Sequence, residues 1–374
     1  MEDEMKVFIK KIESYDYNRI REFLLSLPFW SKLEGKEKIL IKPNMLGAFP
    51  PERAVTTHPV VLEALISILL EKNKKVWMGD GQGGSTPAKR VQEITGFKDV
   101  AEKYNIKLLN FSEGGVHETK GGEMTFHTTR YFWKADAVIS VSKYKTHSLM
   151  SYTGAIKNFY GLIPGMKKSD YHKENPNHIK FGKVLSSLYS GIRERVAFNI
   201  MDGIIGMEGE GPSAGEPRNF GVMFASESAG ALDYVAASMM GFKPETLQYI
   251  MPALQADKIK ASEIEVDEEW RKFRFEKVKI RKVKLLVQIL SYSPKFLTDI
   301  FRKLFQVRPD FHDGCRLCRL CVNSCPAQAM RIEQNALSPR IDYDKCIKCM
   351  CCHELCPYGV VYIRKSFLAK LVLR

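Results

Sequence analysis

All nine cysteines of this 374-residue chain lie between residues 315 and 356, and eight of them form one pattern written twice. The first copy reads C-x2-C-x2-C-x3-C-P from Cys315 to Pro326, and the second repeats it 31 residues later, from Cys346 to Pro357. Thiolates are soft ligands that suit iron–sulfur chemistry, and these short spacings let one loop wrap several corners of a cluster. The pattern therefore predicts two [4Fe–4S] clusters that relay single electrons.

Two other interpretations of the cysteines are a disulfide framework and a zinc ribbon. Repeated triplets of cysteines, in a chain whose first residues do not form a signal peptide, argue against disulfides. A zinc ribbon needs two C-x2-C pairs per site, which leaves the third cysteine and the Cys-Pro of each run unexplained. The cluster interpretation accounts for all eight positions.

The spacing is similar to that of bacterial two-cluster ferredoxins, in which three ligands of one run and the fourth ligand of the other hold each cluster. The resemblance assigns one cluster to Cys315, Cys318, Cys321 and Cys356. It assigns the other cluster to Cys346, Cys349, Cys352 and Cys325. The ninth cysteine, Cys351, aligns with Leu320 of the first copy, so we expect a small buried residue there, with a ligand role as the alternative.

The chain before the cysteines alternates short β-branched runs with amphipathic stretches. Strands are expected at 38–42, 75–80, 106–110, 135–142, 197–202 and 220–225, and helices at 60–72 and 88–93. This alternation predicts an α/β body with a mixed or parallel sheet that helices cover on both faces. We expect the body at 1–254, a basic connecting segment at 255–305 and a small α+β ferredoxin-like domain at 306–374. Within the connecting segment, 277–289 could form an edge strand that leads into a helix.

Polar residues follow several of the expected strands, where sites of α/β sheets collect. Two histidines and two lysines are candidates for catalytic proton transfer: His58, Lys145, His147 and Lys157. The candidates for binding a substrate or an anion are Lys42, Asn44, Asp80, Gly81, Gly83, Lys143, Asn158, Asp202 and Glu208.

Clustered lysines could hold a carboxylate or a phosphate, or one could act as a base if its neighbours lower its pKa. The glycine-rich loop at 79–87 could cup an anion with its N–H groups. The structural alternatives are separate solvated lysines, hydrogen-bonded histidines, a plain tight turn, and capping roles for the acids.

The net charge of +14 is unevenly distributed. Residues 271–310 carry twelve Lys/Arg against three Asp/Glu, and 364–374 is also basic and apolar. These stretches could be solvated faces, or they could bind an anionic membrane surface or an acidic partner. Nucleic acid is not favoured, because no nucleic-acid-binding motif accompanies the charge.

The composition also bears on location. Without an apolar run of about 18 residues, we expect no transmembrane helix. The acidic first residues do not form a signal peptide, and iron-bound thiolates require a reducing compartment. The expected location is therefore cytoplasmic, with peripheral membrane association as a further option.

The run V-S-K-Y-K-T-H at 141–147 and the run T-G-A-I-K-N-F-Y-G-L-I-P-G at 153–165 resemble the family called domain of unknown function 362. I-K-P-N at 41–44, T-H-P at 57–59 and D-G at 202–203 fit the same family in the same order. The resemblance covers about 38–240, and it implies an uncharacterised iron–sulfur protein group that often carries a C-terminal two-cluster ferredoxin. The body is also remotely similar to the fold of the nickel-dependent lactate racemases, although no racemase motif maps residue by residue.

Three functions are compatible with this sequence. The favoured one is an oxidoreductase whose clusters relay electrons to a substrate or cofactor in the body. The others are an electron carrier or assembly protein that docks to a partner or membrane, and a non-redox enzyme with structural clusters. The expected partners are a redox protein or a small-molecule substrate. Nearby cations should raise the cluster potentials: Arg316, Arg319, Lys345 and Lys348.

Overall fold

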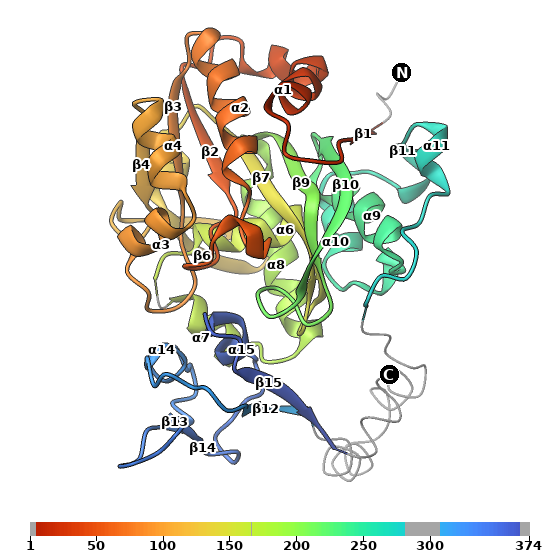
Figure 1. The fold of residues 1–374 in the computed structure, drawn as a ribbon. Helices are drawn as coiled ribbons and strands as arrows, with labels where there is room; N and C mark the ends of the chain where they lie inside the picture. Colours follow the sequence, from red (N-terminus) through yellow and green to blue (C-terminus); the bar gives the residue numbers. More distant parts are fainter. Residues whose placement is uncertain (1–4, 166, 281–306, 367–374) are drawn as a thin grey trace.

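The computed structural model describes residues 5–165, 167–280 and 307–366. We call 5–280 the body and 307–366 the cluster module. The body is built on a nine-stranded mixed sheet (Figure 1). Its strands, in spatial order, are β11 (Ile264–Glu265), β1 (Met5–Lys11), β10 (Glu216–Ser226), β9 (Val196–Glu208), β7 (Ala137–His147), β2 (Lys38–Pro43), β3 (Lys75–Asp80) and β4 (Lys107–Asn110), with β8 (Ser151–Thr153) paired to β7. The five strands from β9 to β4 run parallel, and β10 is antiparallel to β9 and to β1.

Helices cover both faces of the sheet, which confirms the predicted fold class. One face carries α1 (Tyr17–Ser26), α2 (Pro59–Glu71), α3 (Ala88–Ile94) and α4 (Phe97–Lys103). The other carries α6 (Ala155–Asn158), α8 (His178–Ile192), α9 (Ala229–Met240) and α10 (Ile250–Ala256). Side chains of a strand alternate between faces, so Ile39 and Ile41 enter the first core while Leu40 enters the second.

Two central strands are longer than the sequence predicted. β7 continues to His147 and β9 to Glu208, so the lysines of 143–147 and Asp202 lie inside strands rather than after them. The extensions are stabilised because β8 pairs with the end of β7 and β10 pairs with the end of β9, both antiparallel. The β7–β9 register shifts between Lys143 and Lys145, which marks where the irregular extension begins.

A β-hairpin of β5 (Val116–Gly121) and β6 (Met124–Thr129) followed by α5 (Arg130–Lys134) lies outside the main sheet. The segment that starts at 255 contributes β11, which pairs with β1 at the sheet edge, and α11 (Glu268–Arg271), whose Trp270 is buried against the body. Residues 277–280 have no regular structure. The rest of the expected strand and helix, 281–289, lies outside the described residues, as does 367–374.

The cluster module repeats in space the repeat in its sequence. α14 (Leu320–Asn323) and α15 (Cys351–Leu355) each begin after a residue with positive φ, Arg319 and Met350, in the equivalent place of each ligand run. β12 (Val307–Phe311) pairs with β15 (Val361–Lys365), and β13 (Met330–Arg331) pairs with β14 (Arg340–Ile341). The module is thus a small α+β unit, as expected.

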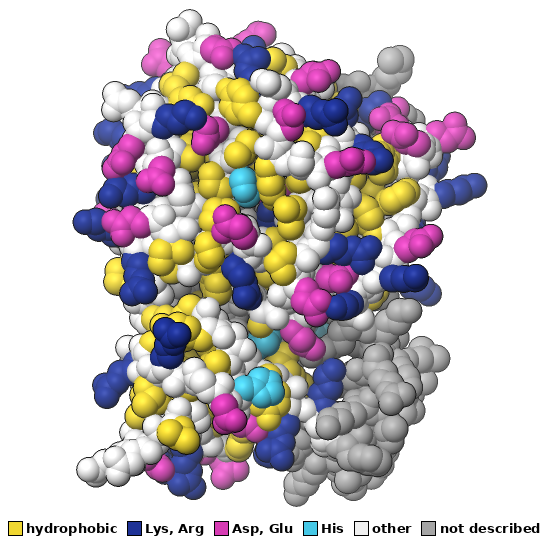
Figure 2. All heavy atoms as spheres, viewed as in Figure 1, with side chains coloured by type: hydrophobic (Ala, Val, Ile, Leu, Met, Phe, Trp, Pro, Cys, Tyr) yellow, Lys and Arg dark blue, Asp and Glu magenta, His cyan; other side chains and the backbone are white. Residues whose placement is uncertain are grey.

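Figure 2 shows positive and negative side chains interspersed over one face of the body. Among the described residues, no helix combines the length and the apolar character needed to cross a bilayer.

Candidate functional site

The first predicted ligand set lines one small cavity in the module. Cys315, Cys318, Cys321 and Cys356 all face it, together with Pro339. Burial, followed by the nearby thiols of the other three cysteines, raises the pKa of Cys321 to about 12. Thiols this crowded resist ionisation on their own, and positively charged iron would relieve that cost. The residues therefore fit a [4Fe–4S] cluster.

The second set is gathered in the same way. Burial, followed by the thiols of Cys349 and Cys325, raises the pKa of Cys346. Burial, followed by the thiols of Cys349, Cys321, Cys346 and Cys325, raises the pKa of Cys352 well above its usual value. The fourth cysteine of the first run thus lies beside the triplet of the second run, as a crossing ligand must. Within the described residues, no three His, Cys, Asp or Glu side chains converge on a single metal ion.

A cavity of about 90 Å³ lies between the second ligand set and the body. In Figure 1 the helix α15 of the module sits next to α7 (Lys167–Glu174) of the body, and both helices contribute to the cavity wall. Its wall includes the following residues of the body: Asn44, Asp80, Gly81, Gly83, Lys145, Lys157, Asn158, Tyr160, Lys168 and His172. The module adds Ser324, Cys351, Glu354 and Leu355. Cys351, the ninth cysteine, is buried and faces this cavity.

Lys42 and Asp80 form a buried ion pair behind the cavity wall, with Lys42 Nζ 2.7 Å from Asp80 Oδ1. The other carboxylate oxygen accepts the N–H of Met45 at 2.8 Å, and Asn158 donates to the carbonyl of Lys42 at 3.2 Å. Burial is the largest influence on Lys42 and lowers its pKa, while Asp80 opposes it. The pair joins the ends of β2 and β3 to α6 and so fixes the cavity wall.

Three more lysines line the cavity itself. Lys145 Nζ donates to Asn44 Oδ1 at 2.8 Å and to the carbonyl of Val55 at 2.6 Å. Lys168 Nζ donates to the carbonyls of Gly81 and Gln82. Burial lowers the pKa of Lys145 well below its usual value, and the positive charges of Lys157 and Lys143 lower it further. Burial is also the main cause that lowers the pKa of Lys157, and it lowers that of Lys168 to about 8.

His147 lies behind the cavity rather than in its wall. Its Nδ1 accepts the N–H groups of Leu149 and Met150, so the neutral ring carries its proton on Nε2. That Nε2 lies 3.2 Å from Oε1 of the buried Glu354. Burial, followed by the charge of Lys157, holds the pKa of His147 well below its usual value. The histidine therefore supports the β7–β8 turn and faces the module.

The glycine-rich loop after β3 is shaped by close packing. The N–H of Gly83 donates to the carbonyl of Leu46 at 2.8 Å, and that of Gly81 donates to Asp80 Oδ1 at 2.8 Å. A Cβ on Gly83 or Gly84 would come within about 3 Å of the Leu355 side chain of the module. These amides are thus engaged within the fold, and the loop forms a contact surface for α15.

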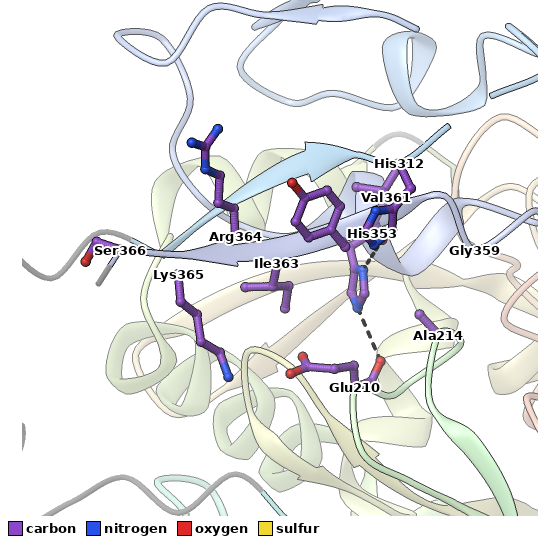
Figure 3. Close-up of a pocket in the computed structure, with 11 residues that line it drawn as sticks. Glu210, Ala214, His312, His353, Gly359, Val361, Ile363, Arg364, Lys365 and Ser366 are labelled. Carbon is purple, nitrogen blue, oxygen red and sulfur yellow. Dashed lines mark hydrogen bonds between the residues drawn. The ribbon is translucent and has the colours of Figure 1, made fainter. Parts of the chain in front are cut away.

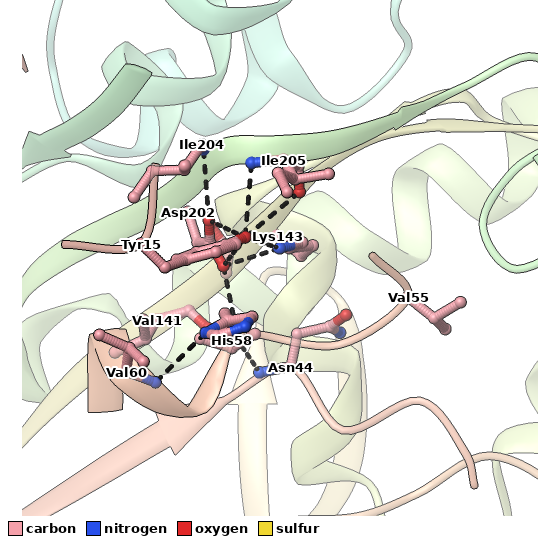
Figure 4. Close-up of polar contacts among 12 residues, drawn as sticks. Tyr15, Asn44, Val55, His58, Val60, Val141, Lys143, Asp202, Ile204 and Ile205 are labelled. Carbon is pink, nitrogen blue, oxygen red and sulfur yellow. Dashed lines mark hydrogen bonds and ion pairs between the residues drawn. The ribbon is translucent and has the colours of Figure 1, made fainter. Parts of the chain in front are cut away.

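A second polar cluster lies apart from the cavity and is centred on the fully buried Asp202 (Figure 4). Its carboxylate accepts from Lys143 Nζ at 2.7 Å and from the N–H of His58 at 3.0 Å, and Tyr15 donates to it at 3.1 Å. The His58 ring stacks on Tyr15, with centroids 3.5 Å apart. Burial lowers the pKa of His58 to about 4.

Glu208 lies in neither group. Its Oε2 accepts from Arg218 at 2.8 Å and from the N–H of Lys279 at 3.1 Å, which ties 276–280 to the sheet. Of the sequence candidates, the structure brings these to the cavity wall: Asn44, Asp80, Gly81, Gly83, Lys145, Lys157 and Asn158. Lys42 and His147 lie directly behind it. His58, Lys143, Asp202 and Glu208 lie elsewhere.

Sequence reasoning missed three ionisable residues of the wall: Lys168, His172 and Glu354. The first two are four residues apart on α7, and their spacing on one helix face was an available signal. Glu354 stands between two cluster ligands, and the cysteine pattern gives it no role. Its backbone carbonyl accepts from Ser213 Oγ at 2.6 Å, which anchors α15 to the body.

A wider cavity of about 1030 Å³ lies along β15 and the loop at 210–214 (Figure 3). There the His353 ring bridges the two parts of the chain, with Nδ1 2.7 Å from the carbonyl of Val361 and Nε2 3.2 Å from the carbonyl of Glu210. No cluster ligand and no lysine of the smaller cavity faces it. The smaller cavity is therefore the stronger candidate for chemistry.

Residues 39–238, more than half of the chain, match the family model described as "Domain of unknown function (DUF362)". The chain belongs to this family. Residues 314–360 match a 4Fe-4S dicluster domain, so this DUF362 member carries 4Fe–4S clusters and has an electron-transfer module.

A thylakoid-associated protein of Synechocystis sp. is 30% identical over 213 residues, which cover 56% of this chain and 65% of that relative. The match thus spans slightly less than two thirds of the relative's length. Among solved structures, a Thermotoga maritima protein is 13% identical, with a TM-score of 0.39 over 67% of this chain and 61% of its own. The lactate racemase apoprotein of Thermoanaerobacterium thermosaccharolyticum is 15% identical, with a TM-score of 0.40 over 58% of this chain and 53% of its own.

Proposed function

We propose that this DUF362 member is an oxidoreductase that relays single electrons through two [4Fe–4S] clusters to a small molecule bound in the 90 Å³ cavity. One observation carries the proposal. The helix α15, which supplies Cys352 and directly precedes Cys356, lines a cavity together with the buried Lys145 and the half-buried Lys157 and Lys168. A reducible ligand in this cavity would contact residues that adjoin cysteines of the second ligand set.

We infer the order of the two sets from one difference in exposure. Each set has two buried cysteines, but Cys318 of the first set is exposed, whereas no cysteine of the second set is. We therefore place electron entry at the first set and exit at the second. Each [4Fe–4S] cluster supplies one-electron redox chemistry when bound.

The lysines of the cavity supply protons. Reducing a double bond X=Y to HX–YH takes two electrons, which an external redox protein provides, and two protons. The ammonium groups of Lys168 and Lys157 can donate them, because burial brings the pKa of Lys168 to about 8 and lowers that of Lys157. Both lysines then regain protons from water.

The test is anaerobic reoxidation of the chemically reduced protein by a panel of small oxo acids and unsaturated acids. Wild-type protein with about eight iron atoms per chain should be reoxidised by at least one compound. Lys157→Met should slow this by roughly a hundredfold or more, the usual effect of losing a proton donor, without changing iron content or the EPR spectrum. Lys183→Met, on the exposed part of α8, is the matched control and should behave as wild type.

Failure of every compound to drain the reduced clusters would count against an oxidoreductase. Equal rates for wild type and Lys157→Met would show that the reaction takes place elsewhere on the chain.

We further propose that the electron donor is an acidic redox protein that docks beside Cys318. Arg316 and Arg319 are exposed next to this cysteine, and the guanidinium of Arg316 lies over the exposed ring of Tyr358 at 5.0 Å. Cationic surfaces steer acidic partners and make association sensitive to salt. Reversing the charge of both arginines should slow reduction by an acidic ferredoxin at low salt, and unchanged rates would exclude this docking face.

The exposed basic stretch from Arg271 to Lys277 supports a peripheral membrane location as a separate proposal. Phe273 is 38% exposed among exposed Arg271, Lys272 and Arg274. A basic segment with an exposed aromatic ring suits an anionic lipid surface. Co-sedimentation with vesicles that contain anionic lipid, but not with neutral vesicles, is the expected result, and loss of binding in Phe273→Ser would locate the contact.

A further inference from the structure

The cavity beside the second ligand set holds a lysine without a direct partner. Lys157 of α6 is half-buried in the cavity wall, and its ammonium makes no hydrogen bond or ion pair with any described residue, although the charge of Glu354 acts on it. An ammonium that loses part of its hydration in a cavity wall gains from a partner of opposite charge. The free ammonium is therefore a place for a ligand of opposite charge.

The charges around Lys157 do not cancel. Four ammonium groups surround the cavity or lie directly behind it, those of Lys42, Lys145, Lys157 and Lys168. The carboxylates of the same region are Asp80 and Glu354. When all these groups are counted as ionised, Lys42 and Asp80 balance each other, which leaves three lysines against one carboxylate. Two negative charges on a ligand would balance the site.

A second polar group also lacks a partner there. His172 is buried in the cavity wall, and its Nδ1 has no hydrogen-bond partner among the described residues. Its ring stacks on Phe181 with centroids 4.1 Å apart, which restrains the plane of the ring. A ligand with oxygen atoms could engage both this ring and the lysines.

The volume limits the size of the ligand. At roughly 10–15 Å³ per water-sized position, 90 Å³ holds about six to nine such positions. Nucleotides are far too large for this space, whereas a three- or four-carbon diacid or an inorganic phosphate fits.

We propose that the cavity binds a small dianionic oxyanion, with Lys157 as its principal ligand and Lys145 and Lys168 as flanking cations. This anion is the substrate class of the proposed oxidoreductase, and its role as a substrate rests on that function. The binding site itself does not depend on it. The shared chemistry is two negative charges on clustered oxygens, which a short dicarboxylate and a phosphate both provide.

The test is isothermal titration calorimetry of the anaerobic holoprotein with malonate, succinate, inorganic phosphate and the bulkier citrate. We expect saturable one-site binding of malonate, succinate or phosphate, and weaker binding of citrate. Preference among the first three separates a dicarboxylate site from a phosphate site. Lys157→Met should raise the Kd by about tenfold or more, as expected for a charge-assisted contact, while Lys183→Met should leave it unchanged.

A second measurement uses only the wild-type protein. Burial brings the pKa of Lys168 to about 8, so affinity for the anion should fall as the pH rises through this value. No saturable binding of any small dianion, or equal binding by Lys157→Met, would overturn the inference, and a Kd for malonate that is constant from pH 7 to 9 would remove Lys168 from the site.

Binding and reoxidation separate the two proposals. Anion binding that depends on Lys157 without reoxidation of the reduced clusters would keep the site and reject the oxidoreductase. Reoxidation by a neutral compound, with no dianion bound, would keep the oxidoreductase and reject this ligand class.

Discussion

The carboxylate of Glu354 and the imidazole of His147 lie 3.2 Å apart across the boundary between the cluster module and the body. Glu354 stands between the cluster ligands Cys352 and Cys356, and His147 ends β7. Both side chains are buried, so the contact is shielded from solvent. It links the position of the second ligand set to the strand that also carries Lys145.

His147→Ala should destabilise the body rather than remove a catalytic group. The substitution would leave the buried N–H groups of Leu149 and Met150 without their acceptor and would open a cavity. We expect the free energy of unfolding to fall by about 2–4 kcal/mol. Urea unfolding followed by tryptophan fluorescence reports on the body, because all four tryptophans lie within 30–270. His178→Ala, on an exposed helix end, should have far less effect, and a stable His147→Ala protein without turnover would instead restore a catalytic role for His147.

The buried Lys42–Asp80 pair should be costly to break from either side. Lys42→Met leaves Asp80 charged and unpaired, and we expect a loss of about 3–5 kcal/mol in the free energy of unfolding. The double variant Lys42→Met/Asp80→Asn should lose much less than the sum of the two single losses. Lys103→Met, which breaks the exposed pair with Glu63, is the control and should change little. Additive losses in the same unfolding assay would show that the two residues act independently.

The sequence was sufficient to predict the layers of the body. The expected strands at 38–42 and 75–80 and the helix at 60–72 agree with β2, β3 and α2 within a residue or two, because local hydrophobic runs decide them. The two ligand sets are what the resemblance to two-cluster ferredoxins implies, and they stay a prediction. These features depend on local sequence.

The division of the candidates into two polar clusters could not be predicted from the sequence. Lys143 and Lys145 are two residues apart on β7, yet Lys143 pairs with Asp202 while Lys145 faces the cavity. The shift in the β7–β9 register between them depends on pairing with β8 and β9, which are distant in sequence. Glu354 and His172 lie in one cavity wall only because the module packs on the body. No local sequence pattern encodes this tertiary contact.

Stability toward acid should depend on His172. Burial, followed by the charge of Lys157, lowers its pKa to about 3, far below the usual value of 6.5. Below pH 6.5 the unfolded chain therefore binds a proton that the folded protein does not bind. The free energy of unfolding decreases as the pH falls. His172→Phe keeps the ring packing on Phe181 and should reduce the loss between pH 6.5 and 5 by about 1.5–2 kcal/mol. Urea midpoints at several pH values measure this, with His117→Phe on the exposed β5 as the control. An unchanged pH dependence would mean that His172 is protonated in the folded state.

The contact between the glycine-rich loop and α15 should hold the cluster module against the body. At Gly84 a Cβ would lie 2.9 Å from Leu355 Cδ1 and 3.0 Å from Ser324 Oγ, so Gly84→Val should push the module away from the body. We expect faster hydrogen exchange in α15 and in the loop at 81–85, with iron content unchanged.

Gly209→Val is the matched control for Gly84→Val. Gly209 has a positive φ of 78°, similar to the 70° of Gly84, but no atom lies within 4 Å of its Cβ position. Only the contact differs between the two variants, because both pay the same backbone cost. Leu355→Ala should restore exchange protection in Gly84→Val by making room for the valine, and equal effects of the two valine variants without such rescue would show that backbone strain alone is responsible.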